Sequence, residues 1–295
     1  MVMHYVKAKG IISPTNGVNL YRGCSHGCIY CDSRSKCYEM SHEFEDIEIK
    51  ENAIELLEAE FQKKRKKVII STGSMSDPYI PLEKELKMTR KMLELIYKYG
   101  HGLHLQTKSN LILRDLDLLK KINQQAKVRI SITLTTYDEE LCKKIEPNVC
   151  TTKERFEVLK QLHAAGIETY VWLSPILPLI NDSLDNLRGI LNYCKEAHVK
   201  GIMCFGFGLT LREGNREYYY QKLDELFPKM KKEYIKSYGT SYICNSRYHK
   251  YLYDFFQKFC EKENILCDND IIFQNLHTLF ENEKYEQLSL FENEE

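Results

Sequence analysis

Short apolar, β-branched runs alternate with longer segments of helical periodicity along the first 210 residues of the chain. The apolar runs predict strands at 17–22, 67–72, 102–107, 127–135, 168–178 and 199–209. The segments between them predict helices at 82–100, 114–125, 152–166 and 183–197, two of which end at a glycine. Such alternation is typical of parallel βαβ units. We therefore predict an α/β fold, a partial (β/α)6 TIM-type barrel over residues 1–210 with fewer than the eight strands of a full barrel.

The alternation stops after residue 210. Segments 218–239 and 247–265 have helical periodicity and many tyrosines, so residues 211–280 are predicted to form a mainly helical C-terminal extension. Residues 281–295 are acidic and are expected to be a flexible tail.

Composition narrows the function classes. Lys+Arg and Asp+Glu number 42 each, so a contact with nucleic acid would need a local basic patch. The N-terminal stretch lacks the apolar core of a signal peptide, and no run is long enough to cross a bilayer, so we expect a cytoplasmic protein with no membrane partner. Eleven cysteines in such a compartment are better interpreted as metal ligands or core residues than as disulfides.

Three of these cysteines, Cys24, Cys28 and Cys31, lie within eight positions of one another, after the first predicted strand. Three thiolates can hold an iron–sulfur cube whose fourth iron has no cysteine and remains open to a small molecule. Gly23 and Gly27 would let the backbone wrap closely around such a cluster.

Other interpretations of the cysteines stay open at this point. Zinc could take His26 or Cys37 as its fourth ligand. A redox pair of Cys28 and Cys31 leaves Cys24 unexplained, and c-type haem would need a histidine where Asp32 stands. A second cluster would have to use more scattered residues, which are also ordinary core cysteines. These are Cys142 with Cys150, or Cys244 with Cys260 and Cys267.

The spacing Cys-x3-Cys-x2-Cys, with Tyr30 before the last cysteine, resembles the radical S-adenosylmethionine (radical SAM) superfamily. Segments 71–83, 106–109, 145–147, 173–182 and 245–253 further resemble its spore photoproduct lyase-like branch. The resemblance implies a [4Fe-4S] cluster, S-adenosyl-L-methionine, a 5′-deoxyadenosyl radical and an external electron donor such as flavodoxin or ferredoxin. It also implies damaged or modified DNA as the substrate. The alternatives are a radical SAM enzyme acting on tRNA, a peptide or a metabolite, and a zinc-binding nucleic-acid adaptor.

The resemblance also implies cofactor contacts. They are expected at Tyr30, Thr72, Gly73, Ser74, Asp77, Lys108 and Ser131, with Ser109 and Thr133 at similar positions. A Ser/Thr/Gly loop at a strand end offers carbonyls and hydroxyls to an ammonium group, although a plain turn before Pro78 explains the same residues. Lys108 is equally well interpreted as a solvated lysine. Arg155 is expected either to reach a carboxylate or to be exposed, and Glu146 to pair with an arginine.

One departure from the branch concerns the return of the hydrogen atom. The resemblance implies a cysteine that re-donates hydrogen near residue 75, where this chain has Met75. A thioether has no transferable S–H. Cys204 or Tyr79 is therefore expected to take that role, or the reaction differs.

Contacts with DNA are predicted from the surface and the tail. Basic residues gather at 63–67, 229–236 and 246–253, and the last stretch mixes them with tyrosines, which suits phosphate contact with base stacking. An amphipathic helix packed on the barrel explains it as well. The peptide QLSLF, Gln287 to Phe291, matches the motif by which bacterial repair proteins dock on the β sliding clamp. Its leucines and phenylalanine could instead fold back on the protein.

Overall fold

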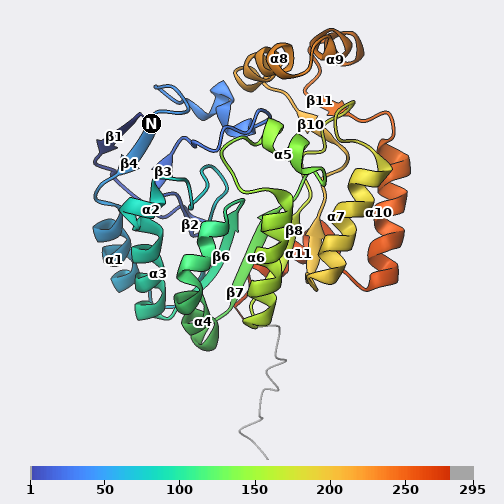
Figure 1. The fold of residues 1–295 in the computed structure, drawn as a ribbon. Coiled ribbons are helices and arrows are strands. Elements are labelled where there is room, and N and C mark those ends of the chain that lie inside the picture. The colour runs from blue at the N-terminus through green and yellow to red at the C-terminus, as the bar shows by residue number, and fades with distance from the viewer. Residues whose placement is uncertain (1, 280–295) are drawn as a thin grey trace, which may run out of the picture.

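The computed structural model describes residues 2–279, so the peptide Gln287 to Phe291 lies outside the described residues (Figure 1). The strands are β1 Met3–Val6, β2 Gly17–Val18, β3 Tyr21–Arg22, β4 Ile47–Lys50, β5 Ile69–Thr72, β6 Gly102–Thr107, β7 Val128–Thr133, β8 Glu168–Trp172, β9 Gly201–Met203, β10 Gly208–Thr210 and β11 Ile243–Asn245. The α-helices are α1 Ala53–Lys63, α2 Glu83–Leu86, α3 Met88–Tyr99, α4 Leu116–Gln125, α5 Glu139–Ile145, α6 Thr152–Ala164, α7 Leu184–Glu196, α8 Asn215–Leu226, α9 Met230–Tyr238, α10 His249–Glu263 and α11 Asn269–His277. Short 3₁₀ helices are η1 Asp32–Arg34, η2 Lys36–Tyr38 and η3 Asn110–Asp115.

The main sheet has six strands in the order β2-β5-β6-β7-β8-β9, and every neighbouring pair is parallel. Every residue of β7 is buried, and so are all but one of β6. Both faces of these central strands are covered, which explains why they lack the alternation of a half-exposed strand. Helices α3, α4, α6 and α7 follow the strands in sequence and lie along the outside of the sheet (Figure 1). The predicted partial barrel is confirmed.

Three predicted strands are wrong in extent. The strand predicted at 168–178 ends at Trp172, and the other two each change sheet part-way. Only β2, the first part of 17–22, joins the main sheet; β3 belongs to a small sheet of order β1-β4-β3. Segment 199–209 likewise divides into β9 of the main sheet and β10, which pairs antiparallel with β11. Gly206, with a φ of +100°, lies at the second break and lets the chain turn there.

The predicted helix 82–100 also divides in two. Lys87 has a φ of +51° and separates α2 from α3. The carboxylate of Glu83 accepts the backbone N–H groups of Met88 and Thr89 at 3.1 and 3.0 Å, and so caps the start of α3. Leu82 and Leu86 pack against the same core as Met92 and Leu93 and continue their helical spacing, so the apolar pattern hides this break.

The segment after residue 210 packs directly on the barrel. Leu266 forms a parallel bridge with Gly201 at the edge of β9. Ile272 and Leu276 of α11 pack with Met203 of β9. The segment predicted as one helix at 218–239 is two, α8 and α9, with Pro228 between them. Among the helices of residues 2–279, none combines the length and apolar character that a membrane span requires.

Candidate active site

The three clustered cysteines line one cavity at the carboxyl ends of β5, β6 and β7. This cavity, here called the cysteine pocket, has a volume of about 120 Å³. Besides Cys24, Cys28 and Cys31 it is lined by segments 73–77 and 106–108, by His26, Tyr30 and Ser33, and by Thr133. Parallel strands bring their carboxyl ends to the same edge, where ligands of such sheets bind.

The backbone of the cysteine loop is held from two sides. On one side the N–H of Cys24 donates to the carbonyl of Phe44 at 3.2 Å. On the other, the N–H of Ile29 donates to the carbonyl of Ile145 at 3.0 Å. Gly23 has a φ of +85°, and a Cβ there would lie 2.5 Å from the Phe44 oxygen. A side chain at position 23 would therefore push the loop away from its support.

The spacing of the three sulfur atoms fits a cluster better than a single ion. The Sγ atoms do not all lie within 4.8 Å of one another, whereas one zinc with Zn–S bonds of about 2.3 Å would bring them closer. Of the fourth ligands considered for zinc, Cys37 lies outside the pocket and His26 lines it, but within residues 2–279 no three ligand atoms of His26 and the cysteines lie within 4.8 Å of one another. His26 Nδ1 lies 3.5 Å from Asp77 Oδ2, and Cys37 is exposed with its Sγ 3.3 Å from Arg212 Nη1.

Burial disfavours the charged thiolate form of these cysteines, so that form needs a positive charge nearby. Burial raises the pKa of Cys24 to about 11, and it raises the pKa of Cys28 and of Cys31 as well. Bound iron supplies the charge that deprotonates a coordinating thiol outright. The donor set therefore fits three cysteines on an iron–sulfur cluster.

A free polar atom in the pocket wall fits a second, organic ligand. The Oγ1 atom of Thr133 is buried and has no hydrogen-bond partner. Unpaired buried hydroxyls are costly and uncommon, so a polar ligand group at this position would satisfy it. Thr133 was one of the residues singled out on the fourth predicted strand.

Asp77 lines the pocket, but its oxygens already accept hydrogen bonds from the protein. Oδ1 accepts from Thr107 Oγ1 at 2.7 Å and from the N–H of Tyr79 at 2.8 Å, and Oδ2 accepts from the N–H of Lys108 at 2.8 Å. Asp77 thus joins the loop after β5 to the loop after β6. The bond to Tyr79 is the turn chemistry that the sequence offered as the alternative explanation of this segment.

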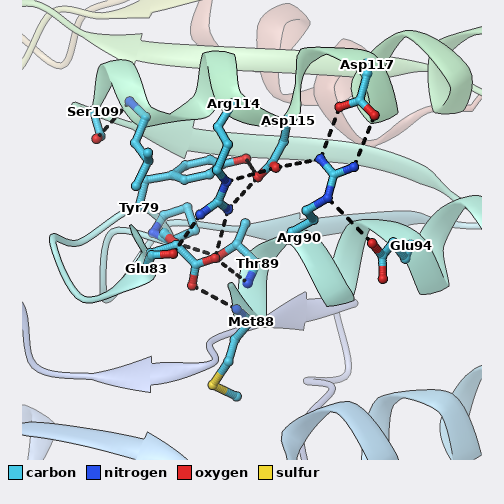
Figure 2. A network of polar contacts seen from close by, with 12 residues as sticks. Tyr79, Glu83, Met88, Thr89, Arg90, Glu94, Ser109, Arg114, Asp115 and Asp117 are labelled. Carbon is cyan, nitrogen blue, oxygen red and sulfur yellow. Dashed lines mark hydrogen bonds and ion pairs between the residues drawn. The ribbon is translucent and has the colours of Figure 1, made fainter. Parts of the chain in front are cut away.

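Tyr79 was expected as a hydrogen donor, and the structure places it outside the lining of the cysteine pocket. Its hydroxyl donates to Asp115 Oδ2 at 3.1 Å inside a buried network, away from the cysteine pocket (Figure 2). Arg90 and Arg114 also bind Asp115, and Arg114 binds Glu83, whose side chain is fully buried like that of Asp115. The network joins α2, α3 and η3 to Tyr79.

Cys204, the other expected hydrogen donor, also lies away from the pocket. It is 3% exposed, belongs to the main hydrophobic core, and its N–H donates to Asn269 Oδ1 at 3.2 Å. Burial raises its pKa to about 12. Ser131 does not line the pocket either, because its hydroxyl contacts His104 Nε2 at 3.0 Å within the barrel. Thr72 is buried at the end of β5, just below the lining residues Gly73 and Ser74.

Tyr30 is fixed by a buried ion pair between Glu146 and Arg155. Its hydroxyl donates to Glu146, which pairs with Arg155, as expected for Glu146. Arg155 is fully buried, so of its two expected positions the exposed one is wrong and the one that reaches a carboxylate holds. Its partner is this glutamate, together with the carbonyls of Thr133 and Cys150, both at 2.9 Å.

A larger pocket opens beside the cysteine pocket and shares Tyr30, Cys31, Ser74 and Lys108 with it. This substrate-side pocket has a volume of about 590 Å³. Its other walls come from the ends of β8 and β9 and from β10 and β11, and include Trp172, Pro175, Phe205, Tyr242, Ile243 and Asn245. These residues were not expected from the sequence. The single tryptophan at a strand's carboxyl end was an available signal, whereas nothing in the sequence places β11 against this pocket.

The remaining cysteines do not support the second cluster that was considered. Cys244 lies in a different hydrophobic cluster from Cys260, with Cys267 packed beside the latter. Cys142 lies against Glu146, Thr152 and Arg155, and Cys150 donates to the carbonyl of Lys108 at 3.0 Å. They are packed side chains of the fold.

A family model connects this geometry to known proteins. The model described as "Radical SAM superfamily" matches residues 18–194, which include the cysteine loop and most of the sheet. The chain belongs to the radical SAM superfamily. It therefore uses a [4Fe-4S] cluster and S-adenosylmethionine (SAM), and it needs a reductant.

The relatives with similar sequences are described as uncharacterized, so they do not indicate which reaction this chain catalyses. The chain is 36% identical over 185 residues to the uncharacterized protein MJ0683 of Methanocaldococcus jannaschii, covering 60% of this chain and 68% of that one. It is 28% identical over 232 residues to the uncharacterized protein Rv2578c of Mycobacterium tuberculosis, covering 75% and 66%. It is also 28% identical over 260 residues to the uncharacterized protein ORF301 of Acidianus two-tailed virus, covering 79% and 84%.

Solved structures support the fold. Spore photoproduct lyase complexed with dinucleoside spore photoproduct matches with a TM-score of 0.60 at 14% identity, covering 88% of this chain and 79% of that one. A mutant of the same lyase matches with a TM-score of 0.61 at 13% identity, covering 88% and 78%. At this identity the likeness concerns the fold alone.

Proposed function

We propose that this radical SAM enzyme acts on a base of damaged or modified DNA in a lyase-like reaction. The observation that carries the proposal is the substrate-side pocket, whose aromatic walls open directly onto the cysteine pocket. The ring centroids of Trp172 and Phe205 lie 5.1 Å apart, and Phe205 is 54% exposed. Exposed aromatic faces in a pocket are suited to stacking on a nucleobase. The likeness in fold to a lyase solved with a DNA lesion agrees with this substrate.

The residues of this chain would divide the work as follows. Cys24, Cys28 and Cys31 would hold the cluster, and Ser74, Lys108 and Thr133 offer polar groups to SAM from the wall of the same pocket. When bound, the cluster and SAM supply a 5′-deoxyadenosyl radical that abstracts a hydrogen atom from the substrate. Tyr30 borders both pockets and is anchored through Glu146, so it would keep the base and the cofactor apart at a fixed distance.

The return of hydrogen requires a donor other than the thioether on the pocket wall. Met75 lines the cysteine pocket, and its side chain has no transferable hydrogen. Tyr242 lines the substrate-side pocket and accepts a hydrogen bond from Arg212 Nη2 at 2.8 Å. That bond uses an oxygen lone pair and leaves the phenolic hydrogen free. Tyr242 is therefore our candidate for the donor, and the tyrosyl radical that it leaves would be restored by an electron from the external reductant and a proton from solvent. Tyr242→Phe should let cofactor cleavage proceed while product formation falls.

DNA would approach over the start of α10. Tyr248 and Tyr251 are 45% and 58% exposed, and the guanidinium of Arg247 lies 4.7 Å from the Tyr248 ring centroid. Arg247 follows two residues after Asn245, which lines the substrate-side pocket. Tyr253, by contrast, packs against the core, as the amphipathic-helix interpretation expected. Recruitment by the β sliding clamp through Gln287 to Phe291, and electron delivery by a flavodoxin or ferredoxin, complete the proposal.

The test is a turnover assay under anaerobic conditions with reductant and deuterium-labelled SAM. Oligonucleotides carrying the dinucleoside spore photoproduct are compared with undamaged DNA, tRNA and peptides. We expect lesion-dependent conversion, which Phe205→Ala abolishes while uncoupled release of 5′-deoxyadenosine persists. Tyr97→Ala, a half-exposed aromatic residue on α3, is the matched control and should change neither. Turnover of tRNA or peptide with none of DNA would refute the DNA substrate.

The clamp is tested separately. A chain lacking residues 284–295 should lose retention on immobilised clamp and keep the same yield of 5′-deoxyadenosine. Equal retention with and without the tail would contradict recruitment through this peptide.

A further inference from the structure

A second group of ligating side chains lies outside the active site, on the small sheet formed by β1, β4 and β3. Ile47 and Ile49 of β4 are fully buried, so the alternation of a strand directs Glu48, between them, to the other face. His4 of β1 is the cross-strand partner of Glu48 in the parallel register. Asp46, directly before β4, lies on the same side as Glu48.

Two of these groups, His4 and Asp46, converge with a second histidine, His42. One ring nitrogen each of His4 and His42 and one carboxylate oxygen of Asp46 all lie within 4.8 Å of one another. His4 Nδ1 is 2.9 Å from Asp46 Oδ1, and His42 Nε2 is 3.6 Å from Glu48 Oε2. Across residues 2–279, no other set of three His, Cys, Asp or Glu side chains comes this close.

The ring of His42 is oriented as a ligand would be. Its Nδ1 lies 3.0 Å from the carbonyl oxygen of Glu43, so this nitrogen carries the proton and donates. Nε2 then holds the free lone pair, and this atom is buried with no hydrogen-bond partner. Metal-binding histidines characteristically donate their other N–H to a carbonyl or carboxylate, which fixes the tautomer in this way.

We propose that His4, His42 and Asp46 bind a divalent metal ion, with Glu48 beside them as a fourth oxygen donor. Two imidazoles and carboxylate oxygens in a compact group suit zinc. The carboxylates of Asp46 and Glu48 balance the charge of the ion. Arg22 is the neighbour of Glu48 on β3, but its Nη2 group donates hydrogen bonds to the carbonyls of Tyr38 and Glu39 instead. His4 and Asp46 are 37% and 26% exposed, which leaves an entry path for the ion.

The bound ion would stabilise the segment that holds the cysteine loop. This inference is independent of the substrate proposed above. The ion would connect β1 to segment 42–46, and within that segment the carbonyl of Phe44 accepts the N–H of Cys24. The alternative is two ion pairs, His4 with Asp46 and His42 with Glu48, which need protonated histidines and no metal.

The experiment titrates zinc chloride into the cluster-reconstituted holoenzyme by isothermal calorimetry at pH 7.5, with zinc and iron counted separately by mass spectrometry. The variants are His42→Ala and Asp46→Asn, the second nearly isosteric so that it keeps the fold. His163→Ala is the control, because the His163 ring stacks on that of His198 at 4.9 Å, elsewhere in the protein. Every protein retains all eleven cysteines, so binding to thiols cancels in the comparison.

We expect one more zinc equivalent in the wild type and in His163→Ala than in the two site variants. In the two site variants the affinity for this zinc ion should fall by more than roughly 10–100-fold, which is the loss when a residue that only supports a metal ligand is removed. Saturating zinc should also raise Tm in the wild type and in His163→Ala but not in His42→Ala. Equal stoichiometry and affinity in all four proteins, or no extra equivalent in the wild type at 100-fold excess zinc, would overturn the site in favour of ion pairs alone.

Discussion

The buried ion pair of Arg155 and Glu146 gives a sharp test of what holds the active site in place. Both side chains are fully buried, and Glu146 also accepts the hydroxyl of Tyr30 from the cysteine loop. Arg155→Met fills similar space but leaves Glu146 with a buried charge that has lost its cation. Two carbonyls, those of Thr133 and Cys150, lose a donor as well. Removing one partner of a buried pair costs about 3–5 kcal/mol, a large part of a typical folding free energy of roughly 5–15 kcal/mol.

The measurement is thermal unfolding of anaerobically prepared protein, followed by circular dichroism at one scan rate. A chain of this length lies at the low end of roughly 2–4 °C per kcal/mol, so Arg155→Met should lower Tm by about 6–10 °C. The double variant Glu146→Gln with Arg155→Met removes both charges and should recover about half of that loss. The control is Arg188→Met, since Arg188 pairs with Asp185 on the surface, where the side chains are 50% and 92% exposed. It should change Tm by no more than about 2 °C.

Two outcomes would refute this reasoning. A Tm for Arg155→Met within 2 °C of the wild type would mean that Glu146 finds another partner or takes up a proton at little cost. A double variant less stable than Arg155→Met would mean that the two side chains contribute independently rather than as a pair.

Three further predictions concern the pocket and the barrel. Thr133→Val removes the unpaired hydroxyl of the pocket wall, so it should weaken SAM binding by roughly 2–10-fold in equilibrium dialysis. Tm should stay within about 2 °C of the wild type. An unchanged affinity would contradict a contact between this hydroxyl and SAM. Gly73→Ala should destabilise by about 1–3 kcal/mol or more in urea titration, because φ is +99° and a Cβ would collide with the Gln106 carbonyl; a neutral result would refute the close approach. Burial lowers the pKa of His104 to about 3, whereas the pKa in the unfolded chain is about 6.5. Below pH 6.5 the unfolded chain therefore binds a proton that the folded protein does not, and the free energy of unfolding falls by about 1.4 kcal/mol per pH unit. His104→Asn should flatten the decline in Tm between pH 6.5 and 5, and an identical pH profile would show that His104 takes up its proton in the folded state.

Much of the fold could be predicted from local sequence patterns. The strands and helices of the barrel could be predicted because a covered parallel strand requires an apolar run and a helix on its outside requires a period of 3.6. The spacing of Cys24, Cys28 and Cys31 predicted a common pocket, because three cysteines within eight positions of one loop stay close together however the rest of the chain folds. The breaks at Lys87 and Gly206 escaped prediction, since a change of direction need not interrupt an apolar pattern.

The sequence by itself therefore determined the architecture and the family, and it predicted that Cys24, Cys28 and Cys31 share one pocket. Only the tertiary structure decided which of the other candidates reach the pocket. Tyr79 is drawn into a buried network by Asp115, 36 positions away, and Arg155 is buried because Glu146 offers it a carboxylate. His4 meets Asp46, 42 positions away, only because β1 and β4 lie side by side. Spacing within a loop or a strand fixes neighbours along the chain, whereas the partner of a buried polar group is set by how distant segments pack, because a group removed from water must find its hydrogen bonds there.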